Sequence, residues 1–135
     1  MKTLLVLEDD PSNMSAFRII FQPLYNTLEA TTGVEALQLV NRHNGPIDLF
    51  VLDVVLPDLS GTEVALRLIH SHPGVRILFL SGTPMDDWCE SDLRNFRQLP
   101  PGSIAFLEKP VHLSILKAKV ESLVNSDASV SEARR

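Results

Sequence analysis

Cysteine, long apolar runs and positive charge are scarce in this sequence. Cys89 is the only cysteine, so the chain can form neither an internal disulfide nor a thiolate metal site, and we expect a cytosolic protein. No apolar run approaches the roughly 20 residues of a membrane span, and the apolar start reaches Glu8 too early for a signal peptide. The 17 Asp+Glu outnumber the 12 Lys+Arg, which argues against direct nucleic-acid binding.

Short apolar runs alternate with longer amphipathic stretches, a pattern that predicts alternating strands and helices. The expected strands are 4–7, 49–52, 76–80 and 104–107, with 26–30 as a more polar strand that is half-exposed or at an edge. The expected helices carry apolar stripes at three-and-four spacing: Met14, Phe17, Ile20 and Phe21; Val34, Leu37 and Val40; Val64, Leu68 and Ile69; Trp88, Leu93 and Phe96; Leu113, Leu116, Val120 and Leu123. Parallel strands need long crossovers, usually helical, so the pattern predicts an α/β fold with helices on both faces of a parallel sheet.

The chain is expected to form one domain, residues 1–125, and a flexible tail, residues 126–135. Its 135 residues are close to the commonest size of a single domain, and the tail is rich in Ser, Ala and Glu without apolar periodicity. No output domain is expected after the last helix. The protein would therefore act by contact with another protein, or belong to a longer kinase or regulator.

Polar side chains follow the predicted strands at the points where they end. Glu8 and Asp9 follow the first strand, Asp53 the third, Ser81 the fourth and Lys109 the fifth. Open α/β sheets bind ligands at the carboxyl ends of their strands, so these groups should converge on one crevice. Neighbouring carboxylates repel one another, and a hard cation such as Mg²⁺ removes that repulsion.

The same side chains fit phosphoryl transfer, in which catalysis is mainly positioning and charge neutralisation. The Lys109 ammonium and the Ser81 hydroxyl can each bind a phosphate oxygen. The carboxylates can hold the cation that neutralises the transferred group. Asp53 would then act as a nucleophile and form an aspartyl-phosphate.

Four segments of the chain resemble the signature segments of response-regulator receiver domains, the phosphoacceptors of two-component signalling. They read LVLEDD at 5–10, LDVVLPDLSG at 52–61, LSG at 80–82 and EKP at 108–110. Each segment alone is a weak signal, but four in order and at the right spacing, over residues 2–125, are a strong one. The resemblance implies a flavodoxin-like topology: a doubly wound sheet of five parallel strands in the order 2-1-3-4-5, with five helices.

The resemblance implies roles for the acidic residues. Asp53 would accept the phosphoryl group from the phosphohistidine of a histidine kinase or a histidine phosphotransfer protein. Asp9 and Asp53 would bind Mg²⁺ or Mn²⁺, with the backbone carbonyl of Val55 as a further ligand. Glu8 would act largely through a metal-bound water.

The resemblance also implies switch residues. Lys109 would hold a phosphoryl oxygen, Ser81 would swing toward the phosphoryl group, and Phe106 would change rotamer with it. Phe106 lacks the phenolic hydroxyl common at that position and is equally consistent with plain core packing. The Lys109–Pro110 peptide would be cis, as is common in the family. The switch would regulate an effector protein or serve a phosphorelay, and the phosphorylated chain could form a homodimer.

One segment departs from the family pattern. Residues 84–102 differ from the compact helix of stand-alone regulators and are more similar to receivers attached to sensor histidine kinases, the hybrid type. Output through the usual face around the fourth helix is therefore left open.

Two other functions stay open at this point. A receiver-shaped interaction module that is never phosphorylated would not need the complete set of strand-end residues. A dehalogenase-type phosphatase also uses an aspartate after a strand, but it needs a second aspartate two residues later, where this chain has Val55. We therefore expect a switch and not an enzyme, with only self-phosphorylation and self-dephosphorylation.

The remaining polar and sulfur-bearing residues are expected to be structural. Asp10 should cap the helix that begins with Pro11, and Asp58 should favour the turn before Gly61. Cys89 should pack on a helix and have no redox role. The histidines expected on the surface near helices are His43, His70, His72 and His112.

Overall fold

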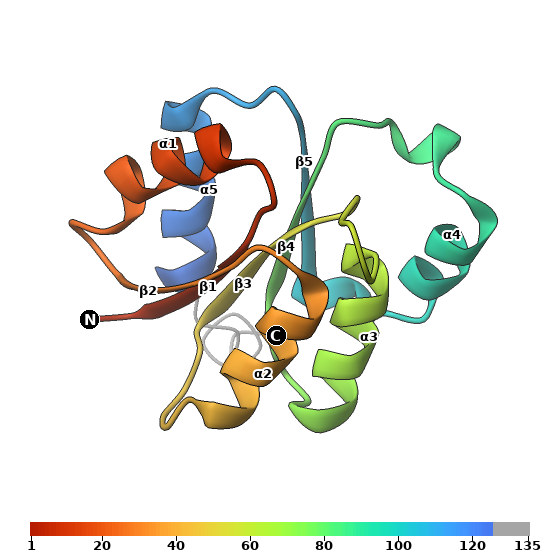
Figure 1. Cartoon of the computed structure of the whole chain (residues 1–135), viewed down its shortest axis with the longest axis horizontal. Coiled ribbons are helices and arrows are strands. Elements are labelled where there is room, and N and C mark those ends of the chain that lie inside the picture. The colour runs from red at the N-terminus through yellow and green to blue at the C-terminus, as the bar shows by residue number, and fades with distance from the viewer. Residues whose placement is uncertain (126–135) are drawn as a thin grey trace, which may run out of the picture.

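Five parallel strands form one sheet in the order β2-β1-β3-β4-β5 (Figure 1), which confirms the predicted fold and strand order. This computed structural model describes residues 1–125, and the predicted flexible tail, 126–135, lies outside the described residues. The strands are β1 (Thr3–Leu7), β2 (Asn26–Ala30), β3 (Leu49–Asp53), β4 (Ile77–Ser81) and β5 (Ile104–Glu108). The α-helices are α1 (Pro11–Phe21), α2 (Gly33–Arg42), α3 (Gly61–Ser71), α4 (Glu90–Arg97) and α5 (Leu113–Asn125). Two short 3-10 turns, η1 (Met85–Asp87) and η2 (Pro101–Ser103), flank α4.

Successive strand residues point to opposite faces of the sheet, and both faces are buried. On one face Leu5, Phe50 and Phe79 pack with residues of α2 and α3 and of the segment around α4. On the other face Leu4 and Val51 pack with residues of α1 and α5, and Figure 1 shows the helices divided in this way. A shift of one residue would exchange the side chains that pack on the two faces and disrupt both sets of contacts. Burial therefore fixes which residues emerge at the strand ends.

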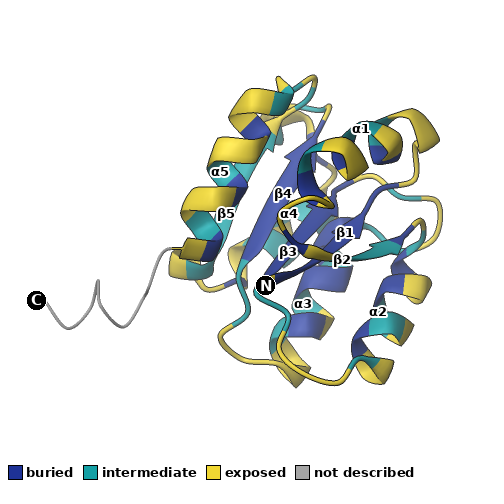
Figure 2. Ribbon diagram, turned by 90° about the vertical axis from the view of Figure 1, so that its left-hand side faces the viewer, coloured by how far each residue is buried: buried dark blue, intermediate teal, exposed yellow. Residues whose placement is uncertain are grey.

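The edges of the sheet are less buried than its centre. Every residue of β1, β3 and β4 is buried, whereas β2 fully buries only Ala30 and β5 fully buries none (Figure 2). Polar residues are tolerated in β2 because an edge strand contacts the sheet on one side only. The predicted polar edge strand at 26–30 is confirmed.

Polar residues fix where the first three helices begin. Asp10 accepts a hydrogen bond from the Ser12 N–H at 2.8 Å, which confirms the predicted cap, and a proline follows it at the first helical position. Thr32 and Ser60 accept hydrogen bonds from the N–H three residues later, at 3.1 and 3.2 Å. Across residues 1–125, no helix is both long enough and apolar enough to cross a membrane.

Three side chains lie elsewhere than predicted. Val34 is 49% exposed, because α2 turns Ala36, together with the predicted Val40, toward the core. Trp88 is buried, but it lies on extended backbone between η1 and α4 and not on a helix. Cys89 is exposed and immediately precedes α4. The predicted place of Trp88 on a helix and the predicted helix packing of Cys89 were therefore wrong, since the helix begins later than the apolar spacing indicated. Trp88 does pack against α4, with its ring centroid 5.6 Å from that of Phe96.

Candidate functional site

Strand pairing brings the predicted acidic residues together at the carboxyl edge of the sheet. β1 pairs directly with β3, and Leu7 lies opposite Leu52. The next residues along these two strands, Glu8 and Asp53, therefore emerge side by side. β4 and β5 follow in the sheet and bring Lys109 toward the same edge.

Lys109 bridges the two buried carboxylates. Its Nζ donates hydrogen bonds to Glu8 Oε1 at 2.8 Å and to Asp53 Oδ2 at 3.1 Å. The Glu8 and Asp53 side chains are only 1% and 8% exposed. Buried charges are costly unless they are paired, so the ammonium makes it possible for both carboxylates to be buried here.

Three carboxylates are arranged to hold a divalent cation. Glu8, Asp9 and Asp53 each offer one oxygen, and these oxygens lie within 4.8 Å of one another. Asp9 is exposed, so the group is open to solvent on one side. One ammonium, from Lys109, leaves a surplus of negative charge that a hard, oxygen-binding cation would compensate. The residues therefore fit Mg²⁺ or Mn²⁺.

Opposing influences set the pKa of Asp53. Burial raises it, the ammonium of Lys109 lowers it, and the charge of Glu8 raises it, with a net rise from 3.8 to about 6. Burial lowers the pKa of Lys109, but the hydrogen bond to Glu8 and the two carboxylate charges more than offset this, so the net pKa is raised. Lys109 is thus firmly charged at neutral pH. In the absence of a cation, Asp53 becomes mainly a carboxylate, the nucleophilic form, only above about pH 6.

Ser81 is fully buried, and its hydroxyl is bound within its own loop. Ser81 Oγ donates to the Thr83 carbonyl at 2.8 Å and accepts from the Thr83 N–H at 3.1 Å. The same carbonyl accepts a hydrogen bond from Trp88 Nε1 at 2.9 Å, and the Trp88 and Phe106 ring centroids lie 5.7 Å apart. Trp88 therefore connects the Ser81 loop to Phe106. Sequence reasoning missed this connection because apolar spacing placed Trp88 on a helix.

The loop between β3 and α3 holds Val55 beside Asp53. Val55 is 63% exposed, and its N–H donates to Asp53 Oδ1 at 3.4 Å. The Gly61 N–H donates to the Val54 carbonyl at 2.8 Å, which closes the base of the loop. A β-carbon on Gly61 would overlap the Asp53 carbonyl oxygen and lie 2.9 Å from the carbonyl carbon. Only glycine permits this close approach.

Asp58, expected only to favour a turn, ties this loop to α2. Its Oδ1 accepts from the Gly33 N–H at 2.8 Å, and its Oδ2 accepts from the Val34 N–H at 2.9 Å. The hydrogen bond from Val34 is the largest cause of the lowered pKa of Asp58. The partners are 24 and 25 residues apart in the sequence, so no local pattern could have indicated them.

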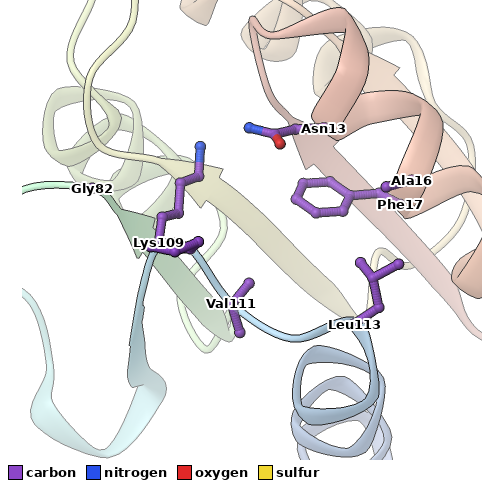
Figure 3. Close-up of a pocket in the computed structure, with 8 residues that line it drawn as sticks. Asn13, Ala16, Phe17, Gly82, Lys109, Val111 and Leu113 are labelled. Atoms are coloured by element: carbon purple, nitrogen blue, oxygen red, sulfur yellow. The ribbon is translucent and has the colours of Figure 1, made fainter.

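A pocket of about 350 Å³ opens beside Lys109, between α1 and the turn after β5. The Lys109–Pro110 peptide in this turn is cis. Figure 3 shows Lys109 on one side of the pocket and Asn13 and Phe17 of α1 on the other. The rest of the lining is Ala16, Gly82, Pro110, Val111 and Leu113. A partner side chain could reach Lys109 from this side.

Known proteins share both the sequence pattern and the fold. The family model described as the response regulator receiver domain matches residues 4–121. The chain is 38% identical over 111 residues to the polar-differentiation response regulator DivK of Brucella ovis, a match that covers 82% of this chain and 85% of DivK. It is 32% identical over 122 residues to the sensor kinase CckA of Brucella abortus, where the match covers 90% of this chain but only 12% of the kinase.

A solved structure with a similar fold is the BeF3-activated receiver domain of DrrB from Thermotoga maritima. The two share 26% of their residues with a TM-score of 0.76, and the match covers 93% of this chain and 99% of the DrrB domain. The chain thus corresponds to most of a small regulator and to a small part of a large kinase.

Proposed function

Because this chain belongs to the family of response regulator receiver domains, we propose that it is a cytoplasmic phosphoacceptor switch of two-component signalling, phosphorylated on Asp53. The observation that carries the proposal is the Lys109 ammonium bonded to both Glu8 and Asp53. It pairs a nucleophilic carboxylate with a positive charge that can also hold a phosphoryl oxygen. The proposal includes no activity on an external substrate.

The proposed donor is the phosphohistidine of a histidine kinase or a histidine phosphotransfer protein. A carboxylate oxygen of Asp53 attacks phosphorus and forms a P–O bond, while the P–N bond breaks and its electron pair stays on the imidazole nitrogen. Lys109 donates to a phosphoryl oxygen and offsets its charge. The groups that would hold Mg²⁺ or Mn²⁺ are Glu8, Asp9, Asp53 and the Val55 carbonyl. When bound, the cation supplies further charge neutralisation.

The pocket beside Lys109 supports an approach of the donor along α1. It adjoins the ammonium and is walled by apolar side chains such as Phe17 and Val111, which can exclude water around an entering imidazole. Ile19 on the same helix is 73% exposed and would be available to a partner surface. The phosphorylated form would then act on an effector protein, pass the group along a phosphorelay, or pair with a second copy.

Phosphorylation is proposed to rearrange the loop after β4. The Ser81 hydroxyl would leave the Thr83 carbonyl for a phosphoryl oxygen, and the carbonyl would keep only the hydrogen bond from Trp88. Phe106, which contacts the Trp88 ring, would change rotamer in the same transition. Trp88 is the only tryptophan of the chain, so its fluorescence should report the change.

Beryllofluoride, named as the activator in the DrrB structure, tests the proposal without a cognate kinase. We expect the emission of Trp88 to change when beryllofluoride is added with Mg²⁺, and to return to its starting value when the metal is chelated. The Asp53→Asn variant lacks the carboxylate that would bond beryllium and should not respond. A wild-type protein that shows neither an emission change nor a bound signal in ¹⁹F NMR would contradict the proposal.

A further inference from the structure

The loop between β3 and α3 carries two backbone groups of Val55 that serve Asp53. One is the N–H that donates to Asp53 Oδ1 at 3.4 Å, and the other is the carbonyl proposed above as a cation ligand. Val55 itself is exposed, so its own side chain does little to hold it in place. Its position depends on how the loop is fixed on either side.

The base and the tip of the loop are fixed by different contacts. At the base, the Gly61 N–H donates to the Val54 carbonyl. At the tip, both carboxylate oxygens of Asp58 accept backbone hydrogen bonds from the start of α2, at 2.8 and 2.9 Å. Leu59 packs against the same point, because a β-carbon on Gly33 would lie 2.9 Å from Leu59 Cβ. The tip therefore rests directly on the first turn of α2.

The first turn of α2 suits a carboxylate from another segment. The leading N–H groups of a helix have no intrahelical partners, and the positive end of the helix dipole favours an anion. Thr32 satisfies only the Glu35 N–H, whereas Asp58 satisfies those of Gly33 and Val34. Helix α2 thus has a cap of its own as well as a second one that comes from the loop.

We propose that Asp58 is a positioning residue for the phosphoacceptor site: by fixing the loop tip on α2, it holds the Val55 carbonyl and N–H in place beside Asp53. The inference rests on the proposed function, since it concerns the cation and phosphoryl group bound there. Asp58 touches neither of them. It acts through the backbone of the two residues that separate it from Val55, Leu56 and Pro57.

Two caps on one helix provide a matched pair of variants. Asp58→Ala removes the hydrogen bonds to α2 together with the loop anchor, whereas Thr32→Ala removes a hydrogen bond to α2 and leaves the anchor intact. Both variants should lower the thermal midpoint, because each deprives the first turn of an acceptor. We expect Asp58→Ala alone to raise the dissociation constant for Mg²⁺, by about tenfold, the lower end for residues that orient a metal ligand. Asp58→Asn keeps one acceptor oxygen and should fall between Asp58→Ala and the wild type.

The measurement is a Mg²⁺ titration followed through the backbone amide signals of Val55 and Asp53 in NMR spectra. A selective loss of affinity in Asp58→Ala, with the Val55 amide shifted before metal is added, would support the positioning role. Equal dissociation constants in Asp58→Ala and Thr32→Ala would show that Asp58 only caps the helix. That result would overturn the positioning role of Asp58 but leave the proposed function standing. A wild type that binds no Mg²⁺ would overturn the proposed function as well.

Discussion

Replacement of Gly61 by alanine is expected to lower the free energy of unfolding by about 3 kcal/mol, at the upper end for overpacked sites. The added β-carbon would overlap the Asp53 carbonyl oxygen and lie 3.0 Å from Val54 Cα. These are backbone atoms, so no side-chain rotation can relieve the clash. The loop must open at its base, and Asp53 must move with it. The variant should therefore also lose phosphorylation under conditions in which it is still folded.

A second glycine provides the control for this substitution. A β-carbon on Gly102 would meet nothing within 4 Å, and its φ is not positive, so Gly102→Ala should change stability by less than about 0.5 kcal/mol. Urea unfolding of the two variants beside the wild type gives the comparison. A Gly61→Ala protein as stable as Gly102→Ala would show that the loop is not closed as described.

Replacement of Lys109 by methionine is expected to lower the free energy of unfolding by about 3 kcal/mol at pH 7.5, because it leaves two buried carboxylates without a positively charged partner. Glu8 and Asp53 are almost completely buried and cannot regain full hydration in the folded state. Addition of Mg²⁺ should restore part of the loss, since the cation replaces the missing positive charge. Urea unfolding with and without Mg²⁺ measures both effects.

The loss of stability in Lys109→Met should depend on pH because of the pKa of Asp53. Its pKa in the folded protein, about 6, lies above the ordinary 3.8. The folded state therefore binds the extra proton, and the contribution of Asp53 to stability falls as the pH rises from 3.8 to about 6. Without Lys109, whose charge lowers this pKa, the fall continues to higher pH. The deficit of Lys109→Met should therefore be smaller at about pH 5, where Asp53 is mainly protonated, than at about pH 7.5.

An exposed lysine provides the control for charge removal. Lys117 lies on the exposed face of α5, and Lys117→Met should change stability by less than about 0.5 kcal/mol at either pH. An equal deficit for Lys109→Met at both pH values would show that packing, and not charge pairing, explains the role of Lys109.

Apolar patterning was sufficient to predict the sheet and its carboxyl edge. The strands β1, β3 and β4 are buried on both faces, so their apolar runs stop abruptly where the chain leaves the core. In β1 and β3 that point is marked by Glu8 and Asp53. Because parallel strands share one carboxyl edge, the end of each run also predicted which side chains would meet. The ion pairs of Lys109 with both carboxylates follow from this rule.

Contacts between side chains and distant backbone could not be predicted in the same way. Periodicity tells which face of an element is buried, but not which N–H group a carboxylate from another loop will reach. The contact of Asp58 with the start of α2 is one such case. The hydrogen bond from the fully buried Thr62 to the side chain of Asp92, at 2.6 Å, is similarly distant in sequence and equally hidden from periodicity. The exposure of Val34 has a related cause. The close approach of Gly33 to Leu59 sets the rotation of α2, so a small residue faces inward where a larger apolar one was expected.

The central claim is that Asp53 is a Mg²⁺-dependent phosphoacceptor, and intact mass spectrometry after incubation with Mg²⁺ and acetyl phosphate tests it most directly. The wild type should gain one phosphoryl group, and neither the Asp53→Asn variant nor the chelated wild type should gain any. A wild type that gains none while it binds beryllofluoride would point to a phosphoryl group lost faster than it is detected. No phosphoryl adduct and no beryllofluoride binding would contradict the account and leave a receiver-shaped interaction module.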